Sequence, residues 1–151
     1  MKELLSNDKI QNDYLYKITQ DFDSFVNFQI AQAKEESVTI GDVSKTQYWL
    51  VKDNEVIGQG VLHHKLNRDL ENHGGHIGYS IRPSFRRQGY GTILLQMMLD
   101  KAKEFGLKQV LLAVKEENVP SIKMIENIGG VFKERTKNED KIGYLLYWIN
   151  L

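Results

Sequence analysis

Residues 83–92 read PSFRRQGYGT, and this stretch joins two segments of different periodicity. Before it, residues 77–81 alternate between large and small side chains, which is the period of a β-strand. After it, apolar residues recur at steps of three and four from Thr92 to Phe105, and Gly106 stands where a helix commonly ends. The stretch therefore predicts a strand, a glycine-containing turn and a long helix.

The turn itself has the features of an anion site. The first N–H groups of a helix have no partner within it, and Gly89 and Gly91 would let a phosphate approach the backbone without meeting a Cβ atom. Arg86 and Arg87 add charged donors, which favours a diphosphate or phosphate ester. The P-loop and dinucleotide-binding patterns do not fit. An ordinary tight turn would use the same two glycines, so the stretch alone leaves both readings open.

The rest of the chain predicts further strands on both sides of this join, with helices between them. Pro120 and the pair Gly129-Gly130 mark the two ends of a short helix. The other predicted elements are a helix over residues 22–33, a hairpin of residues 48–51 and 56–62 around the polar tract 52–55, a helical turn over 68–73, a buried strand over 110–114, and a closing hairpin of 131–132 and 142–149 around 136–141. This order is typical of an α+β or mixed-sheet domain.

Composition excludes several kinds of protein. The 151 residues, 41% of them hydrophobic, fit one compact domain over residues 1–151. Twenty Lys plus Arg balance twenty Asp plus Glu, so the net charge gives no reason to expect a nucleic acid or a membrane surface as partner. No segment approaches the roughly 20 apolar residues of a membrane span, and the first residues lack a signal-peptide pattern. The absence of cysteine excludes disulfides and thiolate chemistry and fits a reducing compartment, so we expect a cytoplasmic protein.

Two signatures together resemble those of a known family. Arg86, Gly89 and Gly91 match a pyrophosphate-binding pattern of Arg or Gln, two residues, Gly, one residue, then Gly or Ala. Asn118 and Ser121, followed by the later glycine pair, are similar to the signature of the next strand-helix unit. Over about residues 48–149 the chain resembles the GNAT superfamily of N-acetyltransferases. The strings LHHKLN at 62–67 and HGGHIGYSIRP at 73–83 look like an uncharacterised bacterial branch of predicted acetyltransferases.

The resemblance implies both a fold and a reaction. The fold is α+β (mixed α/β), with a central mixed, mostly antiparallel sheet of about six or seven strands, flanked by about four helices and splayed between its fourth and fifth strands. The reaction uses acetyl-CoA as co-substrate and moves its acetyl group to a primary amine by direct attack. The acceptor is a small molecule, an amino acid or a peptide. We expect no nucleic-acid or membrane partner and either a monomer or a homodimer.

The resemblance also implies which residues hold the co-substrate. Backbone groups of the family's fourth strand stay free to pair with the amide arm of the cofactor, which supplies partners that buried amides would otherwise lack. The loop and helix start donate N–H groups to the diphosphate, and Asn118 orients the arm, although a helix cap is an equal reading of that residue. The implied cofactor-binding residues are Tyr79, Ser80, Ile81, Arg86, Arg87, Gln88, Gly89, Tyr90, Gly91, Thr92, Asn118 and Ser121.

The catalytic residues common in the superfamily are missing at their positions. The tyrosine expected after the asparagine is Ile125, and the glutamate expected before it is Ala113. The candidate substitutes are Ser121, as a hydrogen-bond donor to the thiolate, and His76, as a base with an ordinary pKa of about 6.5. Tyr144 and Tyr147 in the closing hairpin are further candidate donors.

Each substitute also has a purely structural reading. A serine in a first helical turn often bonds the local backbone, and strand aromatics often serve as packing. Strand alternation counts against His76 as a base, because it puts the ring on the same face as Gly78 and Ser80 unless a bulge reverses the alternation.

Two further residues, His64 and Asn67, are expected in the acceptor pocket. A metal site is not expected, because the adjacent His63 and His64 would point to opposite faces of a strand. The missing tyrosine and glutamate leave a second function open, a non-catalytic acyl-CoA-binding or regulatory domain. The sequence does not indicate the acceptor or the acyl chain that the protein prefers.

Overall fold

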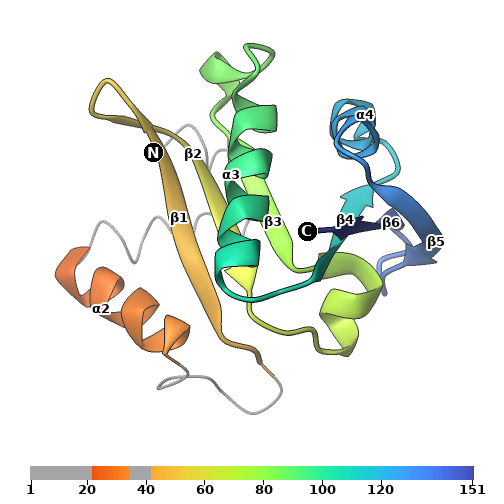
Figure 1. The fold of residues 1–151 in the computed structure, drawn as a ribbon, viewed down its shortest axis with the longest axis horizontal. Helices are drawn as coiled ribbons and strands as arrows, with labels where there is room; N and C mark the ends of the chain where they lie inside the picture. The colour runs from red at the N-terminus through yellow and green to blue at the C-terminus, as the bar shows by residue number, and fades with distance from the viewer. Residues whose placement is uncertain (1–21, 35–41) are drawn as a thin grey trace.

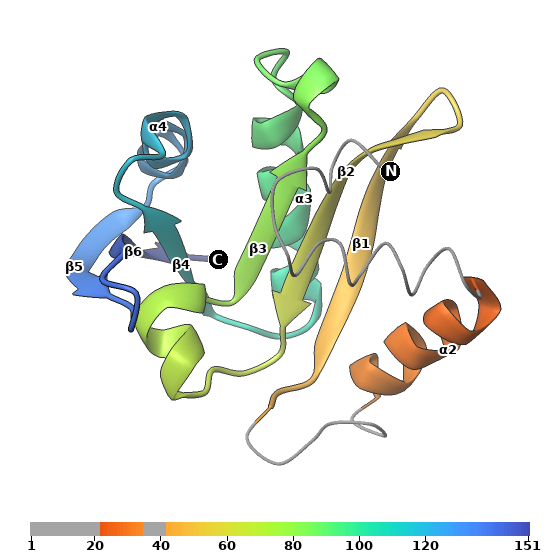
Figure 2. The same cartoon turned by 180° about the vertical axis from the view of Figure 1, so that it is seen from behind.

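The computed structural model describes residues 22–34 and 42–151, which form two three-stranded sheets with helices around them (Figures 1 and 2). In chain order the elements are α2 (Phe22–Ala33), β1 (Lys45–Lys52), β2 (Glu55–His63), the π-helical turn η2 (Leu70–Gly74), β3 (Ile77–Ile81), the 3-10 turn η3 (Pro83–Phe85), α3 (Tyr90–Glu104), β4 (Gln109–Lys115), α4 (Val119–Asn127), β5 (Val131–Lys137) and β6 (Gly143–Asn150). The expected α+β class is confirmed. Residues 1–21 and 35–41 of the expected single domain lie outside the described residues.

Every strand pair within the two sheets is antiparallel. The strand order is β1-β2-β3 in the first sheet and β4-β6-β5 in the second. The predicted hairpin of β1 and β2 turns at Asp53 and Asn54, whose φ angles of 49° and 63° are the left-handed ones that a two-residue hairpin turn needs. The polar tract between the two apolar runs therefore has the role that the sequence indicated.

The two sheets meet where β3 begins. Gly75 forms an isolated bridge with Leu112, and the N–H of His76 donates to the carbonyl oxygen of Leu111 at 2.7 Å. Beyond this point β3 and β4 diverge, and no further ladder joins them in the described part of the chain (Figures 1 and 2). The expected splay between two neighbouring strands is therefore present, and β3 and β4 are those strands.

Helix α3 packs on the first sheet and is fixed in place by its apolar face. Its buried side chains are Leu94, Leu95, Met98, Leu99 and Ala102. Burial of each large apolar side chain stabilises the fold by about 1.5–3 kcal/mol. A Cβ atom at Gly60 of β2 would lie 2.5 Å from the Sδ of Met98, so the glycine permits the close approach of helix and strand. This packing places the first turn of α3 beyond the end of β3.

Several element boundaries differ from the sequence expectation, among them those of α3 and β5. Helix α3 begins at Tyr90 rather than Thr92, because Gly89 takes the left-handed conformation from which the helix starts. Strand β5 extends to Lys137, so Thr136 and Lys137, which we expected in the turn, belong to the strand. Nearly all side chains of β5 are exposed, and an edge strand without alternating burial has no period-2 signal.

Candidate active site

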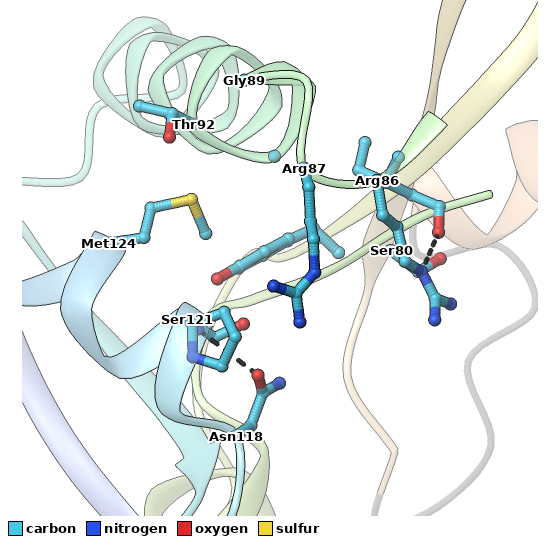
Figure 3. Close-up of a pocket in the computed structure, with 12 residues that line it drawn as sticks. Ser80, Arg86, Arg87, Gly89, Thr92, Asn118, Ser121 and Met124 are labelled. Carbon is cyan, nitrogen blue, oxygen red and sulfur yellow. Dashed lines mark hydrogen bonds between the residues drawn. The ribbon is translucent and has the colours of Figure 1, made fainter. Parts of the chain in front are cut away.

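A cavity of about 560 Å³ lies where the sheets diverge, between β3, the start of α3 and the start of α4 (Figure 3). The residues that line it are Tyr79, Ser80, Ile81, Arg86, Arg87, Gly89, Gly91, Thr92, Asn118, Pro120, Ser121 and Met124. All the residues expected to hold the co-substrate line this cavity except two. Gln88 donates from Nε2 to the carbonyl oxygen of Ser84, and the ring of Tyr90 packs edge-on against Phe85.

One edge of β3 presents backbone groups to the cavity. The N–H of Arg82 donates to the carbonyl oxygen of Ile57 at 2.9 Å, and hydrogen-bonded positions alternate with non-hydrogen-bonded ones along an antiparallel pair. By this register the N–H and C=O groups of Tyr79 and Ile81 point away from β2. No strand of the described part pairs with β3 on that side. The open edge therefore offers partners for a ligand with amide groups.

The start of α3 presents a second set of donors. The first N–H groups of a helix have no partner within it, and no side chain caps this helix. The chain enters the helix at Gly89 with a φ of 86°, in the region that favours glycine. A Cβ atom at Gly89 would meet nothing within 4 Å, and one at Gly91 would lie 3.6 Å from the Sδ of Met124. The helix start thus has the donors, the dipole and the space that an anion requires.

The two arginines of the loop have different roles. The Nε of Arg86 donates to the carbonyl oxygen of Ile81 at 2.9 Å, so Arg86 ties the loop to β3. Arg87, at a φ of 59°, extends its guanidinium into the cavity (Figure 3). A left-handed conformation costs a residue with a side chain roughly 1–2 kcal/mol. Arg87 is therefore the arginine that can meet an anionic ligand.

The start of α4 faces the loop from the other side of the cavity. The Oδ1 of Asn118 accepts a hydrogen bond from the backbone N–H of Ser121 at 3.3 Å, which makes Asn118 the N-cap of the helix. Its amide N–H₂ group is not used by this bond. Ser121 and Met124 lie one helical turn apart on the same face (Figure 3). Given Ser121, helical spacing is the signal that would have indicated Met124, which the sequence reasoning missed along with Pro120.

Two buried hydroxyl groups of β3 lack hydrogen-bond partners among the described residues. They are the Oη of Tyr79 and the Oγ of Ser80. Burial raises the pKa of the Tyr79 phenol, and the Ser121 side chain opposes that rise. An unpaired buried polar group costs about 1–3 kcal/mol, so a site with two of them is incomplete until partners arrive.

His76 lies outside the cavity. It is 7% exposed, and its Nδ1 accepts a hydrogen bond from the N–H of Leu111 at 2.9 Å. Burial, with a smaller contribution from His63, lowers the pKa of His76 from 6.5 to about 4. The residue precedes β3 and joins the two sheets, so the alternation of that strand does not determine where its ring points. The neutral ring is an acceptor within the junction.

The other proposed site residues also have partners elsewhere. The Nε2 of His64 lies 2.8 Å from the Oγ1 of Thr46, and its ring stacks on Phe105. The Oδ1 of Asn67 accepts from the N–H of Leu70 at the start of η2. The ring of Tyr144 lies 5.9 Å from that of His73, and Tyr147 donates from its hydroxyl to Glu126. None of these residues lines the cavity that contains Ser121.

The two positions where the superfamily's catalytic residues are missing are structural here. Ile125 is 1% exposed and belongs to the core. Ala113 pairs with Leu146 across β4 and β6. No helix of the described residues is long and apolar enough to cross a membrane. Within residues 22–34 and 42–151, no three His, Cys, Asp or Glu side chains gather as metal ligands would.

Comparison with known proteins identifies the architecture. Residues 11–129 match the model of the Acetyltransferase (GNAT) family. The chain belongs to this family. The resemblance inferred from the sequence is thereby confirmed. This chain is an acyl-CoA-dependent N-acetyltransferase that uses acetyl-CoA as co-substrate and an amine as acceptor.

Several solved structures share the fold of this chain. A GNAT family acetyltransferase from Elizabethkingia anophelis with acetyl-CoA bound is 21% identical, with a TM-score of 0.60 over 72% of this chain and 77% of that one. RimJ of Mycobacterium smegmatis in complex with CoA-disulfide is 22% identical, with a TM-score of 0.66 over 85% of this chain and 60% of that one. The ribosomal-protein-alanine N-acetyltransferase of Brucella melitensis is 12% identical, with a TM-score of 0.65 over 87% and 79%.

Proposed function

We propose that the enzyme binds acetyl-CoA in the cavity between β3, α3 and α4, with the amide arm along the open edge of β3 and the diphosphate at the start of α3. The observation that carries this proposal is that an edge of β3 to which no described strand is paired and an uncapped helix start face one cavity. Arg87 supplies the charge for the diphosphate. The unpaired hydroxyl of Ser80 fits a polar ligand that completes the site.

The reaction we propose is a direct transfer. The nitrogen lone pair of a neutral amine attacks the thioester carbonyl carbon, the C–S bond breaks, and the amine loses a proton while the coenzyme A thiolate gains one. Among Ser121, His76 and Tyr144, only Ser121 lines the cavity, so we assign to its hydroxyl the hydrogen bond to the departing sulfur. Preorganised donors at the site of developing charge are worth about 10²- to 10³-fold in turnover in known enzymes.

The acceptor class that we propose to test first is the α-amine of a peptide. The support is the similar fold of the Brucella melitensis enzyme, whose name gives a ribosomal protein as its substrate. Small amines and amino acids belong in the same panel. We further propose that residues 1–151 fold as one domain and that the enzyme acts in a bacterial cytoplasm as a monomer or homodimer, without a nucleic-acid partner. The balanced charge and the absence of cysteine support this setting.

Calorimetric titration with acetyl-CoA tests the site. We expect Gly91→Val to weaken binding about tenfold or more, because branched methyl groups enter the cavity and overpacking costs about 1–3 kcal/mol. Gln96→Val, at an exposed position of the same helix, is the matched control and keeps full affinity. Unchanged affinity of a folded Gly91→Val variant would show that the cavity is assigned wrongly.

Thiol release from acetyl-CoA across the amine panel tests the reaction. We expect an acetylated product, identified by its mass, and a loss of about 10²-fold in turnover for Ser121→Ala at saturating acetyl-CoA. Tight binding without turnover for every amine would instead favour the non-catalytic acyl-CoA-binding domain.

A further inference from the structure

The hydroxyl of Tyr79 is the least explained polar group in the cavity wall. Its Oη is buried and makes no hydrogen bond with any described residue. Leaving such a group unpaired costs about 1–3 kcal/mol, and a phenylalanine would fill the same space without that cost. The hydroxyl therefore has a use that the apolar ring does not supply.

The cavity wall contains a second hydroxyl group that could pair with that of Tyr79, and it belongs to Ser121. Tyr79 belongs to β3 and Ser121 to the first turn of α4, so the two side chains come from opposite walls of one cavity. Ser121 lies close enough to affect the pKa of Tyr79. The backbone N–H of Ser121 is held by Asn118, which fixes the position of this turn.

The two residues differ in what they can touch. The Oη of Tyr79 is covered by protein atoms, whereas Ser121 is half-buried and open to the cavity. Of the two hydroxyl groups, that of the serine is therefore the one that can reach a bound ligand. A serine hydroxyl has one proton, so an oxygen that accepts from a tyrosine directs its own proton elsewhere. Hydrogen bonds in such a chain also polarise and strengthen one another.

We propose that Tyr79 is a positioning residue that donates a hydrogen bond to the Oγ of Ser121 and so directs the serine proton to the sulfur of coenzyme A. This inference rests on the proposed function and deepens it. It supplies the role that a tyrosine on the following helix would have, because the corresponding position here is Ile125, which is buried in the core. No proton leaves Tyr79: the pair stabilises negative charge on sulfur by hydrogen bonding as the C–S bond breaks.

The thiol of bound coenzyme A reports on this arrangement without any acceptor. We would measure how fast iodoacetamide alkylates the protein-bound thiol as a function of pH, which gives the pKa of that thiol. A hydrogen bond to a charged group is worth about 1.5–3 kcal/mol, so Ser121→Ala should raise the pKa of the thiol by about one unit or more. Tyr79→Phe should raise it by a smaller amount, and should have no further effect in the Ser121→Ala background.

Controls separate the positioning role from a structural one. Tyr48→Phe removes a phenol hydroxyl from β1, outside this cavity, and should leave the pKa of the thiol unchanged. Tyr79→Phe removes an unpaired group, so the variant should fold with undiminished stability. Calorimetry with coenzyme A should give the same affinity for Tyr79→Phe and the wild type at a pH where the thiol is protonated.

Three results would overturn the inference. They are an unchanged pKa of the thiol in a folded Tyr79→Phe variant, a Tyr79→Phe effect that persists in full without Ser121, and a large loss of coenzyme A affinity in Tyr79→Phe. A wild-type chain that fails to bind coenzyme A would instead overturn the proposed function, and this inference with it. The two failures are therefore distinguishable by the first titration.

Discussion

Arg86 and Ile81 are joined by a 2.9 Å hydrogen bond from the arginine Nε to the isoleucine carbonyl oxygen. This bond closes the loop back onto the strand that precedes it, and it occupies one backbone acceptor on the open edge of β3. The neighbouring Arg87 is left as the arginine that extends into the cavity (Figure 3). Two adjacent arginines thus divide between bracing the loop and meeting the ligand.

Substitution of each arginine by methionine should separate these roles. Arg86→Met should lower the free energy of unfolding by about 1 kcal/mol, because one part-buried hydrogen bond is lost. Arg87→Met should leave stability nearly unchanged but weaken acetyl-CoA binding and reduce the dependence of that binding on salt. Urea denaturation and calorimetry at two ionic strengths provide the measurements. A stronger salt effect at Arg86 than at Arg87 would contradict the assignment.

Removal of the buried Ser80 hydroxyl should make the ligand-free protein more stable. Its Oγ is unpaired, so Ser80→Ala should raise the free energy of unfolding by about 1 kcal/mol. The gain should shrink when acetyl-CoA is saturating, because we expect the co-substrate to pair with the hydroxyl. Thermal melts with and without acetyl-CoA test both points. Ser44, which is fully buried but is not left without a partner, is the control, and Ser44→Ala should lose stability.

Substitution by alanine should affect the stability of the fold differently at two glycines of the first sheet. A Cβ atom at Gly58 would lie 2.7 Å from the Cδ1 of Ile81 and 3.0 Å from the carbonyl oxygen of Ser80, whereas one at Gly78 would meet nothing within 4 Å. Gly58→Ala should therefore cost about 1–3 kcal/mol of stability and also weaken acetyl-CoA binding, since it displaces residues of the cavity wall. Gly78→Ala should be neutral or slightly stabilising for the fold. Equal losses in the two variants would refute this account.

Stability should fall in mild acid because of His76. The pKa of its ring is lowered to about 4 in the folded protein by burial, while the unfolded chain binds a proton near 6.5. The stabilising contribution is therefore complete above about pH 6.5 and is lost as the pH falls toward 4, by on the order of 2–3 kcal/mol. The adjacent His63, whose pKa is also lowered mainly by burial, adds to the same trend.

His76→Asn is the variant that isolates this contribution. Its side-chain oxygen can replace Nδ1 as acceptor for the N–H of Leu111, and it does not titrate in this range. Urea denaturation from pH 7.5 to 5 should show a shallower pH dependence than the wild type. A slope equal to that of the wild type would mean that another group is responsible.

The parts of the fold that were predicted well are those with a local signal. The run Val110–Val114 is uniformly apolar because β4 is covered on both faces, and α3 keeps the three- and four-residue spacing of its buried side chains. Strand β5 could not be read in full, since it has a polar, exposed edge. Its length is set by pairing with β6, which is a long-range contact.

The sequence indicated the backbone segments that line the cavity better than it indicated the contacts of individual side chains. The glycines and Arg87 belong to a local turn, so the spacing within the turn was informative. The bracing role of Arg86 depends on how far the loop lies from β3, and the direction of Tyr79 depends on the splay between sheets. His64 and Asn67 were inferred from a matching string, which carries no spatial information, and their observed partners are Thr46 and Leu70.

The junction at Gly75 determines how wide the cavity between β3, α3 and α4 can be. Gly75 has a φ of 70°, and a Cβ atom there would lie 2.5 Å from the carbonyl oxygen of Leu111. Only a residue without a side chain lets the two sheets come into backbone contact here. The angle between the two sheets is fixed at this contact, and that angle sets how far β3 and β4 stand apart at the cavity. The width of the cavity thus depends on Gly75, a residue that does not line it.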